Sequence, residues 1–211
     1  MKHYHPRKND QEQLAEITTP SKATLLTSWS NPAEMASVVP DGLMPDSVGG
    51  IAISSWNEAP RDHFGWEALA ALSNFTEPLF EPTPGKRPAS GVVVVEEDGR
   101  VWVVSPTNRF GGYANTFPKG TIFSKDDISL RANAIKEAYE ESGLRVELTG
   151  FLADSERSVT TTRYYLARRI GGNPADMGWE SQACHLVPRA MLATVVNHKN
   201  DVSVIRALET N

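Results

Sequence analysis

Three glutamates are concentrated between residues 134 and 144. Glu137, Glu140 and Glu141 follow the spacing i, i+3, i+4, so a helix through this stretch would carry all three carboxylates on one face. Like charges at this spacing repel one another, and the repulsion grows in a cleft of low dielectric constant. Mg²⁺ or Mn²⁺ would relieve it and could bridge the carboxylate oxygens to a substrate phosphate. The pattern indicates a divalent-metal site, and the alternative is a solvated acidic helix face.

The residues on both sides of the glutamates indicate a loop, a helix and a second loop. Thr116-Phe-Pro-Lys-Gly120 is typical of a strand end followed by a tight turn. Gly143 stands where a glycine commonly ends a helix, because glycine adopts the left-handed conformation that the last turn requires. We therefore expect a helix that begins after this turn and stops at Gly143.

Residues 120–144 resemble the signature of the Nudix hydrolase family, G-x5-E-x7-R-E-U-x-E-E-x-G-U, in which U is aliphatic. Gly120 matches the first glycine, Glu137 the glutamate after the arginine, Glu140 and Glu141 the paired glutamates, and Gly143-Leu144 the closing pair. The resemblance implies that the three glutamates are catalytic and bind Mg²⁺ or Mn²⁺. It also implies that the backbone carbonyl of Gly120 is a further metal ligand.

Two positions depart from this signature. Lys136 replaces the arginine, and the stretch between Gly120 and Lys136 is two residues longer than in the pattern. Ile128 consequently stands at the early glutamate, with Asp126 and Asp127 beside it as candidate substitutes. A lysine can still pair with Glu137, although it lacks the rigid bidentate fork of arginine.

Three basic residues are candidates to bind an anionic substrate. Lys119 would place an ammonium group beside Gly120, where it could contact a phosphate. Arg109 precedes Gly111-Gly112, which would let its loop fold closely over a ligand. Arg163 lies in an expected strand. The alternative for each of them is a solvent-facing side chain, and the aromatic residues Phe110, Tyr113 and Trp179 are either stacking partners for a base or core residues.

The catalytic base is expected on a loop outside the signature. Members of the Nudix family differ in the position of this base, and some use a carboxylate on a separate loop. Glu180, in Gly178-Trp-Glu-Ser181, is the first choice, and Asp154 and Glu156 are the alternatives. The predicted catalytic set is therefore Glu137, Glu140, Glu141 and Glu180.

The composition restricts the classes of protein. A net charge of -5 argues against binding to a nucleic acid duplex, which usually requires a basic surplus. Cys184 is the single cysteine, so no disulfide within the chain and no cysteine-based zinc site can form, and we expect it to be buried. The first ten residues lack the apolar segment of a signal peptide, and no window approaches the roughly 18 apolar residues of a membrane span. We expect a soluble cytoplasmic protein.

The pattern of apolar residues predicts strands followed by helices. A hairpin is expected from residue 91 to residue 105, with Asp98-Gly99 as its turn. Further strands are expected at 145–152, 159–168 and 180–187, and helices after Pro188 and after Asn200 or Asp201. These pieces belong to the α/β class, and the resemblance implies a Nudix-type α/β/α sandwich with a mixed sheet.

Residues 1–88 form an amino-terminal extension or a small accessory domain before the expected Nudix hydrolase domain at 89–211. Residues 65–72 predict a short helix, and the prolines between 78 and 88 predict an extended linker. The apolar residues of this part are few for an independent core. We therefore expect the extension to pack on the catalytic domain or on a second copy of the chain in a homodimer.

The function that these residues favour is hydrolysis of a diphosphate linkage by a metal-dependent enzyme. The resemblance implies a small-molecule substrate that is a nucleoside diphosphate derivative, such as a dinucleoside polyphosphate, ADP-ribose or a nucleotide sugar. The alternative is a Nudix-fold ligand-binding or regulatory protein with little turnover, which Ile128 and Lys136 favour. The three glutamates argue against it, because a pure binder has no chemical need for mutually repelling carboxylates.

Overall fold

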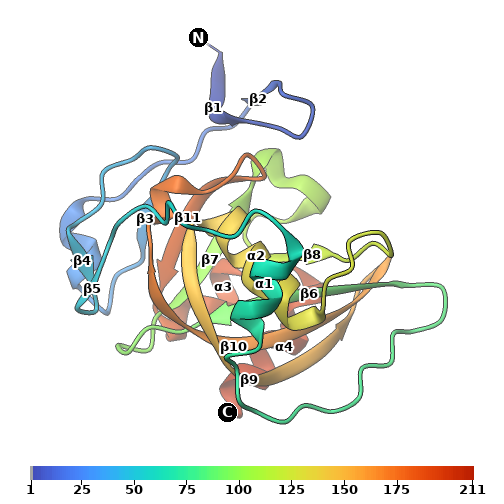
Figure 1. The fold of residues 1–211 in the computed structure, drawn as a ribbon. Helices are drawn as coiled ribbons and strands as arrows, with labels where there is room; N and C mark the ends of the chain where they lie inside the picture. Colours follow the sequence, from blue (N-terminus) through green and yellow to red (C-terminus); the bar gives the residue numbers. More distant parts are fainter. Residues whose placement is uncertain (1) are drawn as a thin grey trace.

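Two β-sheets form the centre of the computed structural model, which describes residues 2–211 (Figure 1). The four-stranded sheet has the order β8-β6-β10-β9, and the three-stranded sheet has the order β3-β11-β7. Their bounds are Lys119–Thr121 (β8), Arg87–Val94 (β6), Thr160–Gly172 (β10), Leu144–Glu156 (β9), Ala36–Val38 (β3), Ser181–Val187 (β11) and Val101–Pro106 (β7). Strands β6 and β10 are parallel and the other pairs are antiparallel, so the larger sheet is mixed, as expected.

The hairpin expected between residues 91 and 105 is confirmed at its turn and wrong beyond it. The amide of Glu96 donates to the carbonyl of Arg100, and Gly99 has the positive φ of 82° that its turn requires. One bridge, between Val95 and Val101, then joins the two strands. They diverge because β6 pairs with β10 and β8, whereas β7 pairs with β11. The turn therefore connects the two sheets.

Helix α2, Leu130–Ser142, carries the three glutamates of the signature. The Ser129 hydroxyl accepts a hydrogen bond from the amide of Ala132 at its start, and Gly143 ends it with a φ of 66°. Its apolar face, which includes Ile135 and Ala138, is fully buried in the core. The helix stop expected at Gly143 is confirmed.

Three shorter helices complete the layers. Helix α1, His63–Ala70, packs beside α2 on one side of the sheets, while α3, Leu192–Val195, and α4, Val202–Glu209, lie on the other (Figure 1). The helix expected after Pro188 is shorter than predicted, since it is split into a 3-10 turn at Arg189–Met191 and α3. Asp201 precedes α4 but does not cap it with its side chain. Its carboxylate instead pairs with the buried Arg157, an interaction between groups distant in the sequence.

The residues before 88 share the core of the sheets. Strand β3 pairs with β11, and the rings of Trp29 and Trp102 lie 5.7 Å apart. Trp56 and Trp66 both pack against Tyr139 of α2. The remaining strands of this part are β1 (His3–Lys8), β2 (Leu14–Ile17), β4 (Ser47–Val48) and β5 (Ile51–Ala52). These contacts agree with packing on the catalytic domain, and the division at residue 88 stays a prediction.

Two further expectations concern single features. Cys184 is a free, fully buried thiol in β11, as expected for a small apolar residue. Across residues 2–211, none of the helices has the length and apolar character that crossing a membrane requires.

Candidate metal centre

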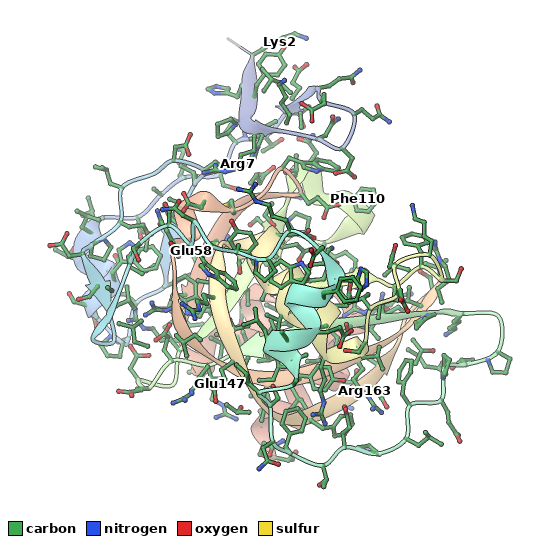
Figure 2. The ribbon with its side chains drawn as sticks, viewed as in Figure 1. Lys2, Arg7, Glu58, Phe110, Glu147 and Arg163 are labelled. Atoms are coloured by element: carbon green, nitrogen blue, oxygen red, sulfur yellow. The ribbon has the colours of Figure 1, made fainter. Side chains whose placement is uncertain are left out.

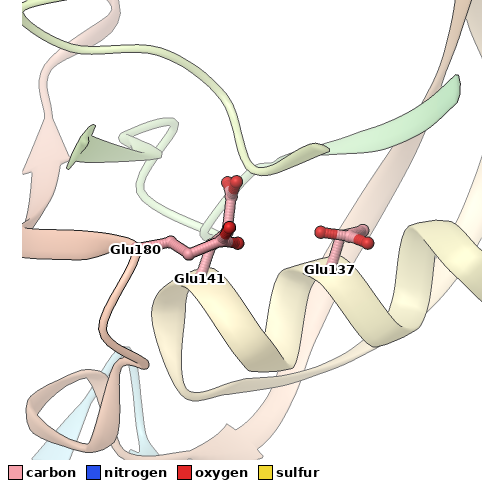
Figure 3. Close-up of side chains that lie close together, drawn as sticks. All are labelled: Glu137, Glu141 and Glu180. Atoms are coloured by element: carbon pink, nitrogen blue, oxygen red, sulfur yellow. The ribbon is translucent and has the colours of Figure 1, made fainter. Parts of the chain in front are cut away.

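Three carboxylates from two elements meet beside strand β8. Glu137 and Glu141 project from α2, and Glu180 belongs to the turn that precedes β11 (Figure 3). One oxygen atom from each of these side chains lies within 4.8 Å of the others. The helix supplies two members through its i, i+4 periodicity. The third member, Glu180, lies 39 positions after Glu141 in the sequence. It reaches α2 because the turn before β11 is bonded to the end of that helix, where the Gly178 amide donates to the Glu140 carbonyl.

The surroundings disfavour negative charge on these carboxyls. Burial raises the pKa of Glu137 to about 7, with Glu140 and Glu180 adding repulsion and Lys136 opposing it. Burial likewise raises the pKa of Glu141 to about 8, where Lys119 is the opposing cation. The pKa of Glu180, which is exposed to solvent at the rim of the group, is raised in the same direction by partial loss of hydration and by repulsion from Asp10 and Glu140. Lys136 and Lys119 therefore do not supply enough positive charge to keep all three carboxyls ionised at their ordinary pKa values.

Strand β8 fits closely against this face of α2. A Cβ atom at Gly120 would overlap the carboxylate of Glu137, so the missing side chain provides the space that this carboxylate occupies. The amide of Lys119 donates to Glu141 Oε2 at 3.1 Å. Asn133 Nδ2 donates to the Gly120 carbonyl at 3.3 Å and to Ser90 Oγ at 3.0 Å. Gly120 also pairs with Ser90 in the sheet, and the role of its carbonyl as a metal ligand stays a prediction.

Asn133 is a site residue that the sequence interpretation missed. It lies one helical turn before Glu137, on the same face of α2, and it is buried. The i, i+4 spacing to Glu137 is the signal that could have identified it. Its amide fixes the position of the strand that carries Gly120.

Glu140 lies beside the group of three and is not a member of it. Its carboxylate accepts a hydrogen bond from Lys136 Nζ at 2.6 Å, and its side chain is 46% exposed. Lys136 also contacts Glu137 at 3.4 Å. The predicted pairing of Lys136 with Glu137 is therefore present, but it is shared with Glu140. The predicted role of Glu140 as a metal ligand stays a prediction.

Of the three loop carboxylates considered as a base, Glu180 is the one that joins the glutamates of α2. Asp154 instead pairs with Arg163, and Glu156 accepts hydrogen bonds from Thr83 and Lys86. The structure therefore brings Glu180 to the site expected for it. Its catalytic role stays a prediction.

The three basic residues occupy different environments. Lys119 lies beside the glutamates, with Nζ 5.1 Å from the centre of the Tyr113 ring. Arg109 is exposed, in a loop where its φ is 57°. Arg163 is 2% exposed, and it donates to both carboxylate oxygens of Asp154 and to the Pro78 carbonyl. Figure 2 shows Arg163 well away from Phe110, which follows Arg109. Substrate binding by all three stays a prediction, and Arg163 has its donors engaged within the protein.

The three aromatic candidates for base stacking also lie in different environments. Phe110 is 82% exposed, whereas the Tyr113 ring stacks on His198 with centroids 4.0 Å apart. Trp179 is partly buried, and its Nε1 donates to Asp10. Stacking on a nucleotide base stays a prediction for each of them.

The candidate substitutes for the early signature glutamate, Asp126 and Asp127, lie just before α2. Asp126 accepts a hydrogen bond from the amide of Phe123 and closes a turn, and Asp127 is exposed. Neither belongs to the group of three carboxylates. Glu67 of α1 instead accepts hydrogen bonds from the amide and hydroxyl of Ser129. A carboxylate from the amino-terminal extension thus lies at the positive end of α2.

The donor set fits a hard divalent cation. Carboxylate and carbonyl oxygens are the ligands that Mg²⁺ and Mn²⁺ prefer. The space at Gly120, the short separations among the carboxylates and their raised pKa values all agree with a site that a cation would stabilise.

Comparison with known proteins agrees with this geometry. The NUDIX domain family model matches residues 85–208, which is more than half of the chain. The protein belongs to the Nudix family, whose members are typically pyrophosphohydrolases that act on nucleotide derivatives and usually require a divalent metal. No curated protein was found to match the chain.

Several solved structures are similar to the chain at low sequence identity. An ADP-ribose pyrophosphatase from Streptococcus suis shares 22% identity with a TM-score of 0.49, covering 61% of this chain and 92% of that one. An Ap4A hydrolase from C. elegans shares 17% identity with a TM-score of 0.48, covering 58% and 96%. A NUDIX hydrolase from Nitrosomonas europaea shares 17% identity with a TM-score of 0.46, covering 85% and 88%.

Proposed function

We propose that the protein hydrolyses a diphosphate linkage in a nucleoside diphosphate derivative and uses Mg²⁺ or Mn²⁺ as its cofactor. Dinucleoside polyphosphates, ADP-ribose and nucleotide sugars are the substrate classes. The observation that supports this proposal most strongly is the meeting of Glu137, Glu141 and Glu180 within 4.8 Å. Three carboxylates this close together, each with a raised pKa, have a clear use in holding a divalent cation.

Each residue of the centre has a distinct task in this reaction. Glu137 and Glu141 would hold the cation together with the Gly120 carbonyl, and Glu140 would add negative charge at the rim. A bound divalent ion neutralises charge on the phosphoryl oxygens and makes a water molecule more acidic. Glu180 would accept the proton of the attacking water, a role that agrees with its raised pKa, and its negative charge in the same group would also strengthen binding of the cation.

Lys119 and Arg109 are proposed to contact the phosphates. Lys119 is anchored beside the centre, because its own amide is bonded to Glu141. Replacement of Lys119 by Met should raise KM by about tenfold, on the scale of one lost charge-assisted hydrogen bond. Arg109→Met should have a smaller effect, since this side chain is exposed. Michaelis–Menten kinetics on both variants measures the difference.

Chromatographic separation of substrate and products tests the proposed function, because hydrolysis of an internal diphosphate linkage leaves both phosphates on the organic products and releases no free phosphate. The substrate panel consists of dinucleotides, nucleotide sugars, nucleoside triphosphates and inositol pyrophosphates, each with Mg²⁺ or Mn²⁺. Glu141→Gln and Glu140→Gln should each reduce turnover at least about a hundredfold, since each removes a negative charge beside the cation. Glu147→Gln is the matched control, because Glu147 lies on β9 and pairs with Arg168.

A ligand-binding protein with little turnover is the second candidate. The observations that favour it are Ile128 at the early glutamate of the signature and the engagement of Glu140 by Lys136. Equally negligible turnover by the wild type and by Glu141→Gln across the whole panel would support this candidate and contradict hydrolysis.

A further inference from the structure

Glu180 is the one member of the three-carboxylate group that no helix positions. It lies in a turn, closed by a hydrogen bond from the Ser181 amide to the Gly178 carbonyl at 3.1 Å. In a turn of this kind, the position of the Glu180 side chain depends on how firmly other segments bind the backbone of the turn. The contacts of residues 179–182 therefore decide where the Glu180 carboxylate lies relative to α2.

Three successive carbonyls of this turn are bonded to other segments. Thr107 donates its hydroxyl to the Trp179 carbonyl at 2.7 Å and its amide to the Glu180 carbonyl at 2.8 Å. His5 of β1, which is fully buried, contacts the Ser181 carbonyl through Nε2 at 3.1 Å. His5 Nδ1 accepts from the Arg7 amide, so Nε2 carries the proton and donates. The amino-terminal strand thus bonds directly to the residue after Glu180.

Asn108 connects the same turn to the end of β2. Its amide donates to Gln182 Oε1 at 2.9 Å, and its side-chain Nδ2 donates to the Glu16 carbonyl at 2.7 Å. Its Oδ1 accepts from both the amide and the hydroxyl of Thr18. The backbone of Asn108 is left-handed, with a φ of 55°, a conformation that asparagine tolerates better than most residues. Asn108 is therefore bonded to both segments at once.

Gln182 and Trp179 make further bonds to the amino-terminal residues. Gln182 Nε2 donates to the Thr19 carbonyl at 2.8 Å and to Ser21 Oγ at 2.9 Å. Trp179 Nε1 donates to Asp10 in the turn between β1 and β2. Figure 1 shows this hairpin above the turn that begins β11. A two-stranded hairpin is only marginally stable alone. These bonds therefore stabilise both the hairpin β1–β2 and the turn that contains Glu180.

We propose that residues 3–21, which comprise the hairpin β1–β2 and the segment after it, position Glu180 in the metal centre, with Asn108 as the main connecting residue. This inference rests on the proposed function, since it assigns these residues to the centre in which Glu180 acts. Asn108, Gln182 and His5 are positioning residues that do not touch substrate. The amino-terminal extension accordingly acts on the active site through the position of Glu180.

A double-mutant cycle tests the proposal in the full-length protein. Asn108→Gly keeps the left-handed backbone and removes the bonds to Glu16 and Thr18. It should weaken Mn²⁺ binding by about fivefold and lower kcat by about tenfold with KM unchanged, as expected for a displaced reactive group. In a Glu180→Gln background the same substitution should change Mn²⁺ affinity and kcat by less than about twofold. Calorimetry measures the affinity without any need for turnover.

Asn31→Gly is the matched control. Asn31 also lies in the extension and bonds through its side chain, but to Ala33 and Glu34. This variant should bind Mn²⁺ and turn over substrate as the wild type does. A similar loss in Asn31→Gly and Asn108→Gly would overturn the proposal, since it would show a general loss of stability.

A second variant separates loss of these hydrogen bonds from misfolding of Asn108→Gly. Gln182→Met keeps the length of the side chain and removes its bonds to Thr19, Ser21 and Asn108, and it should behave as Asn108→Gly does. Equal losses in the wild-type and Glu180→Gln backgrounds, or no loss in either, overturn the positioning role. A protein that binds Mn²⁺ in the predicted Asn108-dependent way and hydrolyses nothing contradicts the proposed function alone.

Discussion

Glu137 of α2 lies directly against Gly120 of β8, in the space that a side chain at residue 120 would fill. Gly120→Ala would therefore displace the Glu137 carboxylate or push β8 away from α2. We expect Mn²⁺ affinity to fall about tenfold and turnover about a hundredfold, because a small displacement of a ligand is costly for catalysis. Calorimetry and the chromatographic assay measure the two effects.

Gly150→Ala is the control for this substitution. Nothing lies within 4 Å of a Cβ atom at Gly150, and its φ is not in the left-handed region. It should leave both Mn²⁺ affinity and turnover unchanged. Wild-type behaviour of Gly120→Ala would contradict the close fit of Glu137 against β8.

Removal of metal should make Glu141 a source of instability. Its folded pKa of about 8 exceeds its ordinary value of 4.5. Between these values the folded state keeps a proton that the unfolded state has released, so the stability of the metal-free protein falls as pH rises through this window. In EDTA at pH 8, Glu141→Gln should therefore raise the free energy of unfolding by about 1 to 3 kcal/mol.

Addition of Mn²⁺ should reverse this order. The wild type gains stability by binding the ion, and Glu141→Gln gains less because it has lost a ligand. Thermal unfolding with EDTA and with Mn²⁺ measures both changes. A variant that is less stable than the wild type in EDTA at pH 8 would contradict the assignment of Glu141 as a partly buried acid that destabilises the metal-free protein.

Arg163 is expected to act on stability and not on substrate binding. Its side chain is 2% exposed and pairs with Asp154 and Glu77. Arg163→Met would leave these partly buried carboxylates without their partner, and we expect a loss of about 2 kcal/mol in the free energy of unfolding. KM should stay unchanged. A rise in KM with unchanged stability would instead support the role in substrate binding predicted from the sequence.

His185 should make the protein sensitive to acid. It is buried between the hydroxyls of Ser37 in β3 and Ser105 in β7, and burial lowers its pKa to about 4 from 6.5. Below pH 6.5 the unfolded chain binds a proton that the folded protein does not. The stabilising contribution is therefore complete above pH 6.5 and is lost as pH falls towards 4, by up to about 3 kcal/mol.

Urea unfolding between pH 4 and pH 7 measures this dependence. His185→Gln can still bond to the two hydroxyls but does not titrate, so its free energy of unfolding should vary less across the window. An identical pH dependence in both proteins would show that other groups cause the loss of stability. Ser37→Ala removes one of the two partners and serves as a check on the hydrogen bonds themselves.

The sequence by itself determined the features that depend on local spacing. The interval between Glu137 and Glu141 places two carboxylates on one face of any helix that contains them, and Gly143 ends that helix because it takes a positive φ. The strands expected at 145–152, 159–168 and 180–187 are confirmed as β9, β10 and β11, although β9 and β10 each continue four residues beyond the expected end. The resemblance to the Nudix signature then indicated the family, which the comparison confirms.

Tertiary structure decided everything that depends on partners distant in the sequence. The sequence left Glu180, Asp154 and Glu156 as competing candidates, and only the first meets α2, because β11 begins beside the end of that helix. Arg163 is engaged by Asp154 and Glu77, and the strands on either side of Asp98-Gly99 separate into two sheets. Sequence spacing fixes directions along one helix or strand, whereas loop positions and ion pairs follow from which segments pack together.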